Sequence, residues 1–266
     1  MLELYHGEGS VCARKVRIVL AEKGITDWVG HMVNLGRGEQ TRPDYLALNP
    51  KGVIPTLVHD GRVITESTVI CEYLEDIYPQ PSLRPSDPFD TAMMRKWAKI
   101  PDDEIHPACA AISSAGLLGR GRRKNKEQYL KQLANVPDRI RAENARGCTI
   151  ERWSYPVVRT AVLLHEKLLS NMEKELSRNG PWLAGSMFTL ADIGITPYIH
   201  RLLEMGLKGI WANRPHVADW LTRVMDRPSF KEAIDQYEAR YVVDADEEED
   251  KRDWAAVQEI LAAGWS

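Results

Sequence analysis

The stretch 2-LELYHGEGSVCARKVRIVLAEKG-24 decides the fold, because it predicts a short strand, a turn and a helix in immediate succession. An apolar run over residues 2–5 is closed by Gly7 and Gly9, a pattern typical of a strand that ends in a turn. Apolar residues from 16 to 20 then fall at helical spacing, and Gly24 stands where a helix C-terminus favours a residue that tolerates positive φ.

Ser10 lies at the N-terminal mouth of the predicted helix. A helix N-terminus presents unpaired amide hydrogens and a partial positive charge, so an anion held there is stabilised without a cationic side chain. A serine hydroxyl that donates a hydrogen bond to sulfur lowers the pKa of a thiol, which suits this position to a thiolate. The alternative is that Ser10 only caps the helix, since serine is a favoured N-cap residue.

Cys12 also falls in the first turn of this helix, but CARK lacks the second cysteine of a C-x-x-C pair, so dithiol chemistry is not expected. The alternative is a small buried apolar residue. The other cysteines, Cys71, Cys109 and Cys148, show neither metal-site nor disulfide spacing. We expect all four thiols to be reduced.

Composition predicts a soluble, cytoplasmic protein, and the length allows either one large core or, as the preferred interpretation, two modest ones. Charged residues make up 27% of the 266 residues and the net charge is −3, which favours neither a nucleic acid nor an anionic membrane as partner. No apolar run approaches the length of a membrane span, and MLELYHGEGS lacks the regions of a secretory signal.

Residues 28–35 predict a second strand, residues 43–48 a short helix, and 49-NPKGVIPTLV-58 a turn that leads through Pro55 into a third strand. A proline entering a strand removes a ladder hydrogen bond. A cis Ile54–Pro55 bond would account for it by turning the amide and carbonyl of Ile54 outward. The alternative is a trans proline that starts an edge strand.

Asp60-Gly61 between two apolar runs predicts a β-hairpin over residues 58–64. The segment 65-TEST-68 then precedes apolar residues at helical spacing, which predicts a capped helix start with exposed hydroxyls and a carboxylate. This start offers either plain capping or a second site for an anion or zwitterion.

The proline-rich segment PQPSLRPSDP, which begins at Pro79, predicts a linker, and strand signals almost vanish beyond it. Helical patterns follow at residues 89–118, 126–135, 154–178, 189–206, 215–225 and 229–240. Thr189 and Asp192 predict a structural capping box. Residues 119–126 are interpreted as a solvated loop, and the acidic run 244–250 as a frayed end. A stripe from Trp254 to Leu261 predicts a final helix that packs across the domain interface.

In this order and spacing, the Ser10 turn, NPKGVIPTL, the hairpin and ITESTVICEYLED resemble the N-terminal thioredoxin-like domain of cytosolic glutathione S-transferases. The linker, the helical region and GPWLAGSMFTLADI resemble the C-terminal half of that family, so the resemblance covers nearly all of residues 1–240. It implies an α/β thioredoxin-like domain over residues 1–78, a linker over 79–88 and an all-helical domain over 89–266. It also implies a two-fold homodimer, glutathione as co-substrate and no metal.

The resemblance carries functional roles onto matching positions. Ser10 matches the hydroxyl that stabilises the glutathione thiolate in serine-type classes such as zeta and theta. Ile54 and Pro55 match the residue and cis proline whose backbone pairs with the cysteinyl part of glutathione. Glu66 and Ser67 match the pair that holds the γ-glutamyl end. Gln40 matches a polar position near the glycyl carboxylate, with Arg42 or Lys51 as alternatives for that role.

The resemblance implies a detoxification-type transferase in which bound glutathione thiolate attacks a hydrophobic, aromatic electrophile. ITESTVICEYLED followed by LRPSDPF, and the stretch from 135 to 147, are similar to bacterial β-etherases, which use glutathione to cleave an aryl ether next to a ketone. The turn GEGSVC is closer to the zeta-like S-x-C. Alternatives are thiol-disulfide or deglutathionylating chemistry through Cys12, and a non-catalytic ligand-binding protein.

The second substrate is expected to bind between the two domains. Residues 96–106 and the final helix are expected to face Ser10 across the cleft. Trp97 and Trp254 would then offer the flat apolar surface that aromatic substrates favour.

Overall fold

A computed structural model describes residues 1–238 and 246–265. The first domain consists of β1 (Leu2–His6), α1 (Val11–Glu22), β2 (Trp28–Met32), α2 (Pro43–Leu48), β3 (Thr56–His59), β4 (Arg62–Thr65) and α3 (Ser67–Ile77). The second begins with α4 (Pro88–Ile100), α5 (His106–Ala115), α6 (Leu117–Lys124), α7 (Lys126–Leu133), α8 (Arg139–Ile150) and α9 (Pro156–Asn179). It continues with α10 (Leu190–Glu204), α11 (Pro215–Met225), α12 (Pro228–Phe230), α13 (Gln236–Glu238) and α14 (Glu247–Ala263). The single turns η3 (Pro101–Ile105), η4 (Arg152–Ser154) and η5 (Lys208–Trp211) join some of them.

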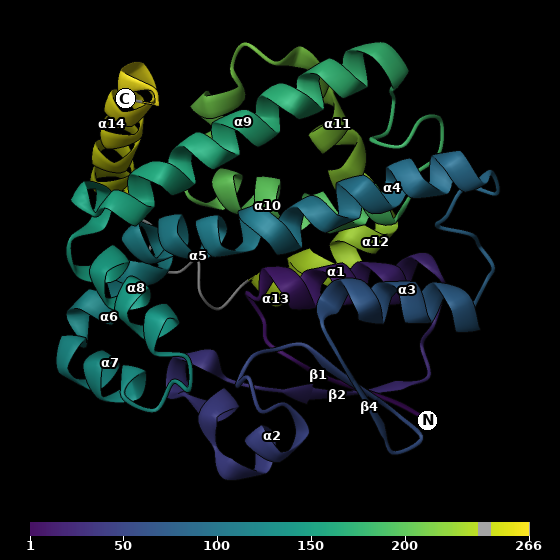
Figure 1. Ribbon diagram of the computed structural model, residues 1–266, viewed down its shortest axis with the longest axis horizontal. Coiled ribbons are helices and arrows are strands. Elements are labelled where there is room, and N and C mark those ends of the chain that lie inside the picture. The colour runs from purple at the N-terminus through teal and green to yellow at the C-terminus, as the bar shows by residue number, and fades with distance from the viewer. Residues whose placement is uncertain (239–245, 266) are drawn as a thin grey trace.

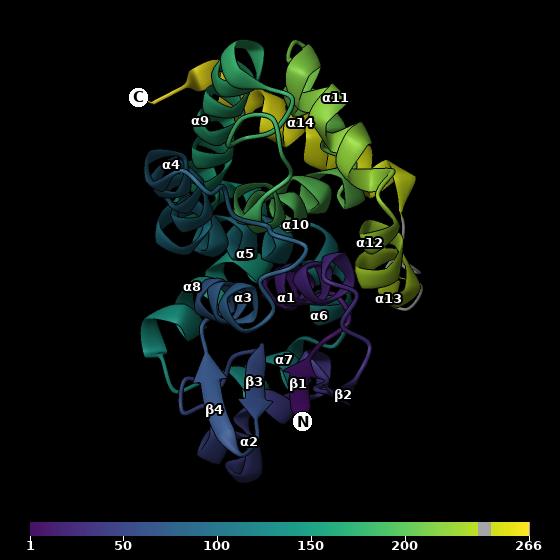
Figure 2. The same ribbon diagram turned by 90° about the vertical axis from the view of Figure 1, so that its right-hand side faces the viewer.

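The first domain is built on a four-stranded sheet of order β2-β1-β3-β4, in which β1 runs parallel to β2 and antiparallel to β3. The predicted hairpin is confirmed, with φ of 50° at Asp60 and 77° at Gly61, the positive values that a tight two-residue turn requires. Figures 1 and 2 show α1 and α3 between the sheet and the helical domain, and α2 on the other face of the sheet. The fold is therefore a thioredoxin-like domain followed by a helical domain.

The two domains share one hydrophobic core, which corrects the expectation of two separate ones. A single cluster of buried side chains runs from Leu4 in β1 through Val16 in α1 and Ile199 in α10 to Val257 in α14. A small second cluster among the described residues, Val33, Tyr45 and Ile54, lies apart from it. The domains are therefore held in a fixed relation by a continuous apolar interior.

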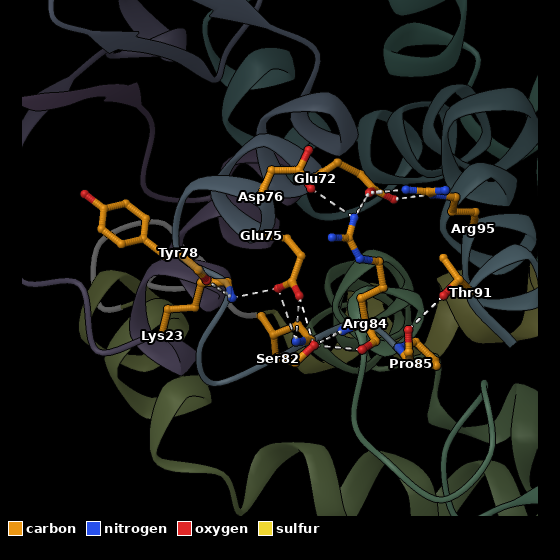
Figure 3. Close-up of polar contacts among 11 residues, drawn as sticks. Lys23, Glu72, Glu75, Asp76, Tyr78, Ser82, Arg84, Pro85, Thr91 and Arg95 are labelled. Carbon is orange, nitrogen blue, oxygen red and sulfur yellow. Dashed lines mark hydrogen bonds and ion pairs between the residues drawn. The ribbon is translucent and has the colours of Figure 1, made fainter. Parts of the chain in front are cut away.

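The linker between the domains is fixed by buried polar contacts (Figure 3). Lys23 Nζ lies 2.6 Å from Glu75 Oε2 and donates to the carbonyls of Tyr78 and Pro81 at 2.6 and 3.0 Å. Glu75 in turn accepts from the Leu83 amide at 3.1 Å. The Leu83 carbonyl then accepts from the amide of Leu190 at 3.0 Å, which ties the linker to the start of α10.

Of residues 119–126, expected as a loop, residues 119–124 belong to α6 and Lys126 begins α7, and α8 lies outside the helices that the sequence predicts. Arg120 and Arg123 of α6 pair with Asp250 and Glu249 of α14. The acidic run is therefore not frayed from Asp246 onward: it forms the N-cap and first turn of α14, where acids favour the helix dipole. Residues 244 and 245 lie outside the described part of the chain.

The final helix is confirmed, but α14 packs against α9 and η4 of its own domain rather than across the domain interface. Figures 1 and 2 show it on the side of the helical domain away from the sheet. Asp253 anchors it by accepting from the indole of Trp153 at 2.6 Å and from Arg152. No helix in the described part of the chain is long and apolar enough to cross a membrane.

Candidate active site

Ser10 stands at the start of α1, as the sequence predicts. Its backbone is extended, with φ −72° and ψ 116°, and its Oγ accepts a hydrogen bond from the Ala13 amide at 3.2 Å. The side chain is partly exposed. Because capping uses only the lone pairs of the oxygen, the hydroxyl proton remains available to donate to a ligand. Capping and thiolate stabilisation are thus compatible at this residue.

The turn before Ser10 is held by arginine side chains. Arg17 donates to the carbonyls of Gly7 and Glu8 at 3.0 and 3.1 Å, and Arg201 of α10 donates to the carbonyl of Gly9. One turn of α1 after Ser10, the guanidinium of Arg14 forms an ion pair with the carboxylate of Glu204 at 2.7 Å. These buried contacts fix the position of the turn relative to α10, so the helical domain helps to place Ser10.

The sheet register brings the expected glutathione-binding residues to one edge. Tyr5 of β1 pairs with Thr56 of β3, and Thr56 pairs with Thr65 of β4, so the residues just outside these positions are neighbours. They include the Ser10 turn, the Ile54–Pro55 bond, which is cis as expected, and the Glu66–Ser67 start of α3. A Cβ at Gly7 would lie 2.7 Å from Ile54 Cδ1 and 3.1 Å from the Val33 carbonyl oxygen, so a larger residue here would require its neighbours to shift.

Glu66 adopts a φ of 69°, a conformation that costs a non-glycine residue of order 1–3 kcal/mol. Its carboxylate is exposed and lies 2.7 Å from Lys51 Nζ. The predicted side-chain capping of α3 is wrong, because Glu66 occupies the N-cap position without a capping hydrogen bond. The first-turn amides next to buried Ser67 are therefore not used by a side-chain cap at Glu66.

Gln40, in the short η2 turn (Glu39–Thr41), is half-buried. Its Oε1 is buried and has no hydrogen-bond partner within the described residues. Arg42 and Lys51 are the two alternatives for the position near the glycyl carboxylate. The guanidinium of Arg42 lies 3.4 Å from the carboxylate of Glu39, and the ammonium of Lys51 pairs with Glu66. The Oε1 of Gln40 can accept a hydrogen bond from a ligand, and the amide nitrogen of the same side chain can donate one.

The structure corrects both predicted lining tryptophans. Trp97 is 8% exposed and belongs to the shared core, so its face is not open to a ligand. The indole of Trp254 fills the space that a Cβ at Gly209 would need, 2.3 Å from its ring, and so packs on η5. Neither side chain presents the expected flat surface across from Ser10.

Another set of side chains meets α1 instead. Cys12 Sγ lies 3.4 Å from Nδ1 of His106 at the start of α5 and 3.7 Å from the hydroxyl of Tyr198 in α10. His106 ends the stretch expected to face Ser10. No sequence signal marks Tyr198, because α10 is buried over residues 190–202 and so shows no one-sided pattern. The pairing of Cys12 with His106 has no sequence signal either, because the two residues are 94 positions apart and only the fold brings them together.

The surroundings of Cys12 change its acidity. Burial by itself raises the pKa of this thiol, but the nearby charges of His106 and Lys15 and the hydrogen bonds from His106 and Tyr198 outweigh it, and the pKa falls to about 6. Burial raises the pKa of Cys71 to about 12. In the described residues, no group of three or more histidine, cysteine or acidic side chains is arranged to hold a metal ion.

Comparison with protein-family models matches residues 4–82 to the glutathione S-transferase N-terminal domain and residues 155–228 to the glutathione S-transferase C-terminal domain. Protein LigF from Sphingobium sp. is 32% identical over 247 residues, covering 88% of this chain and 93% of that protein. The crystal structure of β-etherase LigF superposes with a TM-score of 0.76 at 30% identity, covering 88% of this chain and 99% of that one.

Two other relatives differ in their named activities. Maleylacetoacetate isomerase from Pseudomonas aeruginosa is 30% identical and covers 87% of this chain and 95% of its own length. The 2,5-dichlorohydroquinone reductive dechlorinase from Sphingobium indicum is 28% identical and covers 88% of this chain and 82% of its own length.

Proposed function

The chain belongs to the glutathione S-transferase family of glutathione-dependent enzymes, and on this premise we propose that Ser10 activates bound glutathione for attack on a hydrophobic, aromatic electrophile. The observation that carries the proposal is the geometry of Ser10. Its oxygen is used by the Ala13 amide, so its proton is available to donate to the glutathione sulfur at the positive end of α1. The protein itself forms no covalent intermediate in this transfer.

The same sheet edge supplies groups for the rest of the tripeptide. The backbone of Ile54 lies before the first paired residue of β3 and is proposed to pair with the cysteinyl part. Glu66, Ser67 and the first-turn amides of α3 are proposed to hold the γ-glutamyl amine and carboxylate. Gln40 is proposed to donate its amide to the glycyl carboxylate.

A pKa lowered by one to two units corresponds to about 1.4 to 2.7 kcal/mol of thiolate stabilisation. We expect Ser10→Ala to lower kcat with a halonitroarene by roughly tenfold or more near pH 6.5, since each pKa unit is a factor of ten in thiolate at low pH. The KM for glutathione should change far less, because the tripeptide is held by other groups.

A matched control separates catalysis from helix capping. Asp87 caps α4 by accepting from the amides of Phe89 and Asp90, far from the Ser10 turn in sequence and outside the proposed site. Asp87→Ala should cost about as much stability as Ser10→Ala, roughly 1 kcal/mol, while kcat is retained. Unchanged kcat in Ser10→Ala would refute the assignment of Ser10.

A second candidate substrate is a β-aryl ether next to a ketone. It is favoured by the similarity to LigF, whose solved structure is titled a β-etherase. A substrate screen with glutathione should include a halonitroarene, an isothiocyanate, a peroxide and a β-aryl ether ketone. Turnover of the ether with release of a phenol would favour ether cleavage, and turnover of the halonitroarene alone would favour general aromatic transfer.

A two-fold homodimer is the proposed assembly, with the first domain of one subunit against the helical domain of the other. Large apolar side chains exposed on both domains favour it: Val63 at 44%, Val69 at 55% and Phe89 at 69%. Sedimentation should give a species of twice the 30.2 kDa chain mass at micromolar concentration. A monomer under those conditions would contradict the assembly.

A further inference from the structure

A segment of the helical domain reaches the loops of the first domain. We call residues 126–141 the arm; they comprise α7, the connection after it and the first turn of α8. Figures 1 and 2 show α7 at the level of the sheet. In the arm, Gln132 Nε2 donates to the carbonyl of Gly36 at 2.8 Å, and Arg141 Nη2 donates to the carbonyl of Lys51 at 3.1 Å. The arm therefore contacts two separate loops of the first domain.

These two loops and the arm meet around Gly52. A Cβ at Gly52 would lie 3.1 Å from the carbonyl oxygen of Gln40 and 3.7 Å from Cδ of Pro137 in the arm. A Cβ at Gly38 would lie 3.9 Å from Cγ of Gln132. The arm thus borders the loop that carries Gln40, which is the position proposed for the glycyl carboxylate of glutathione.

The arm is anchored to the rest of the helical domain by buried contacts. Tyr129 of α7 is buried, donates to the carbonyl of Ala145 in α8 at 3.0 Å and accepts from the hydroxyl of Thr149 at 3.1 Å. The preceding helix, α6, is tied to α14 by the ion pair of Arg123 with Glu249. The position of the arm is therefore fixed from the side of the helical domain.

Arg141 brings a positive charge without a close counter-charge to this corner. Its side chain is half-buried, and in the described part of the chain its guanidinium has one hydrogen-bond partner, the Lys51 carbonyl, and no ion-pair partner. Burial lowers the pKa of Arg141, and the charge of Asp138 opposes this only in part. A guanidinium has five donors in a planar fork that matches a carboxylate, so most of this capacity remains for a ligand.

The arm lies outside the residues that carry the family assignment. The N-terminal family model matches residues 4–82 and the C-terminal one residues 155–228, so residues 126–141 belong to neither. Membership of the family therefore implies no role for the arm, and the contacts of this chain are the basis for assigning one.

We propose that the arm forms the outer wall of the glutathione site and that Arg141 makes this site selective for a thiol tripeptide with a free terminal carboxylate. The inference rests on the proposed function for the placement of the glycyl end beside Gln40. Arg141 pairs with the carboxylate from the side of the helical domain, and Gln40 donates to it from the first domain. An ester at this end carries no charge for Arg141 to bind.

The first test measures dissociation constants by calorimetry, without an electrophile, for glutathione and for its glycyl ethyl ester. The unaltered protein should bind glutathione at least about tenfold more tightly than the ester, because only glutathione offers a charged partner to the guanidinium. Arg141→Gln should weaken glutathione binding about tenfold and change ester binding less than about twofold. Arg141→Lys should recover part of the loss, since the charge remains but the fork geometry does not.

Arg146 provides the matched control on the same helix. Its guanidinium is 43% exposed and pairs with Glu143, so Arg146→Gln should change neither dissociation constant. Equal affinities of the unaltered protein for the two ligands, or equal weakening of both in Arg141→Gln, would overturn the role of Arg141 and leave the assignment of Ser10 standing. Failure of the unaltered protein to bind glutathione at all would refute the proposed function and this inference together.

The second test measures the contact between the arm and the loop of Gln40. Gln132→Ala removes the hydrogen bond to Gly36, so amide hydrogen exchange over residues 34–42 should accelerate at least about threefold, and glutathione should bind more weakly. Gln128, exposed on α7, gives the control: Gln128→Ala should leave both unchanged. Exchange over residues 34–42 that is the same in Gln132→Ala and the unaltered protein would overturn the arm as a wall of the site.

Discussion

Glu75→Gln tests the buried ion pair that fixes the linker. The side chains of Lys23 and Glu75 are 0% and 2% exposed, and the ammonium has three partners: one carboxylate oxygen and two carbonyls. An ammonium has three donors, so all of them are satisfied. Glutamine has nearly the same shape as glutamate but carries no negative charge. Its amide group would also place a second donor next to the Lys23 ammonium and the Leu83 amide, from which Glu75 now accepts.

The expected loss is large because the lysine remains buried without its counter-charge. Removing one partner of a buried ion pair costs roughly 3–5 kcal/mol in the free energy of unfolding. For a chain of this length, that corresponds to a fall in melting temperature of roughly 6–20 °C. The cost should be much lower if Lys23 is replaced at the same time by methionine, since no uncompensated charge then remains.

Urea unfolding and thermal scans of the full chain measure the loss, and Glu72→Gln provides the control. Glu72 lies on the same helix and pairs with Arg95, which is 55% exposed, so its loss should cost less than about 1 kcal/mol (Figure 3). Equal losses for Glu72→Gln and Glu75→Gln would refute the reasoning that burial makes the Lys23 pair costly to break.

Two further stability predictions follow from buried acceptors. Asp192 accepts from the Leu183 and Thr189 amides at 3.0 Å and from the Trp220 indole at 2.8 Å, so Asp192→Ala should cost roughly 3 kcal/mol or more in urea unfolding; a loss below about 1 kcal/mol would contradict a structural role. Asp253→Ala removes the acceptor of Trp153 and should lower hydrogen-exchange protection in α14 by roughly 1–3 kcal/mol, whereas unchanged protection there would contradict its role as anchor.

Features set by local patterns could be predicted from the sequence. The Asp60-Gly61 hairpin, the short helix from Pro43 and the capping box of Thr189 with Asp192 all depend on residues within a few positions of one another, and the structure confirms them. Ser10 at the start of α1 belongs to the same class. Local chemistry determines such elements, so the sequence alone was sufficient.

Features set by contacts between residues far apart in the chain could not be predicted from the sequence. The acidic run looked self-repelling because the arginines that neutralise it, Arg120 and Arg123, lie more than 100 residues earlier in a segment interpreted as a loop. The apolar stripe that contains Trp254 predicts a buried helix face, but it does not identify the element that covers this face, which is η5 for the indole of Trp254. His106 and Tyr198 became part of a site only because the domains pack on each other around α1.

The central claim is that the start of α1 lowers the pKa of the glutathione thiol through Ser10. The most direct measurement is titration of the bound thiol by its ultraviolet thiolate absorbance, in Cys12→Ser protein so that only glutathione contributes at that site, with and without Ser10→Ala. We predict a bound pKa one to two units below that of free glutathione, about 1.4 to 2.7 kcal/mol, which returns toward the free value in Ser10→Ala. A bound pKa equal to that of free glutathione, or one that Ser10→Ala leaves unchanged, would contradict the account.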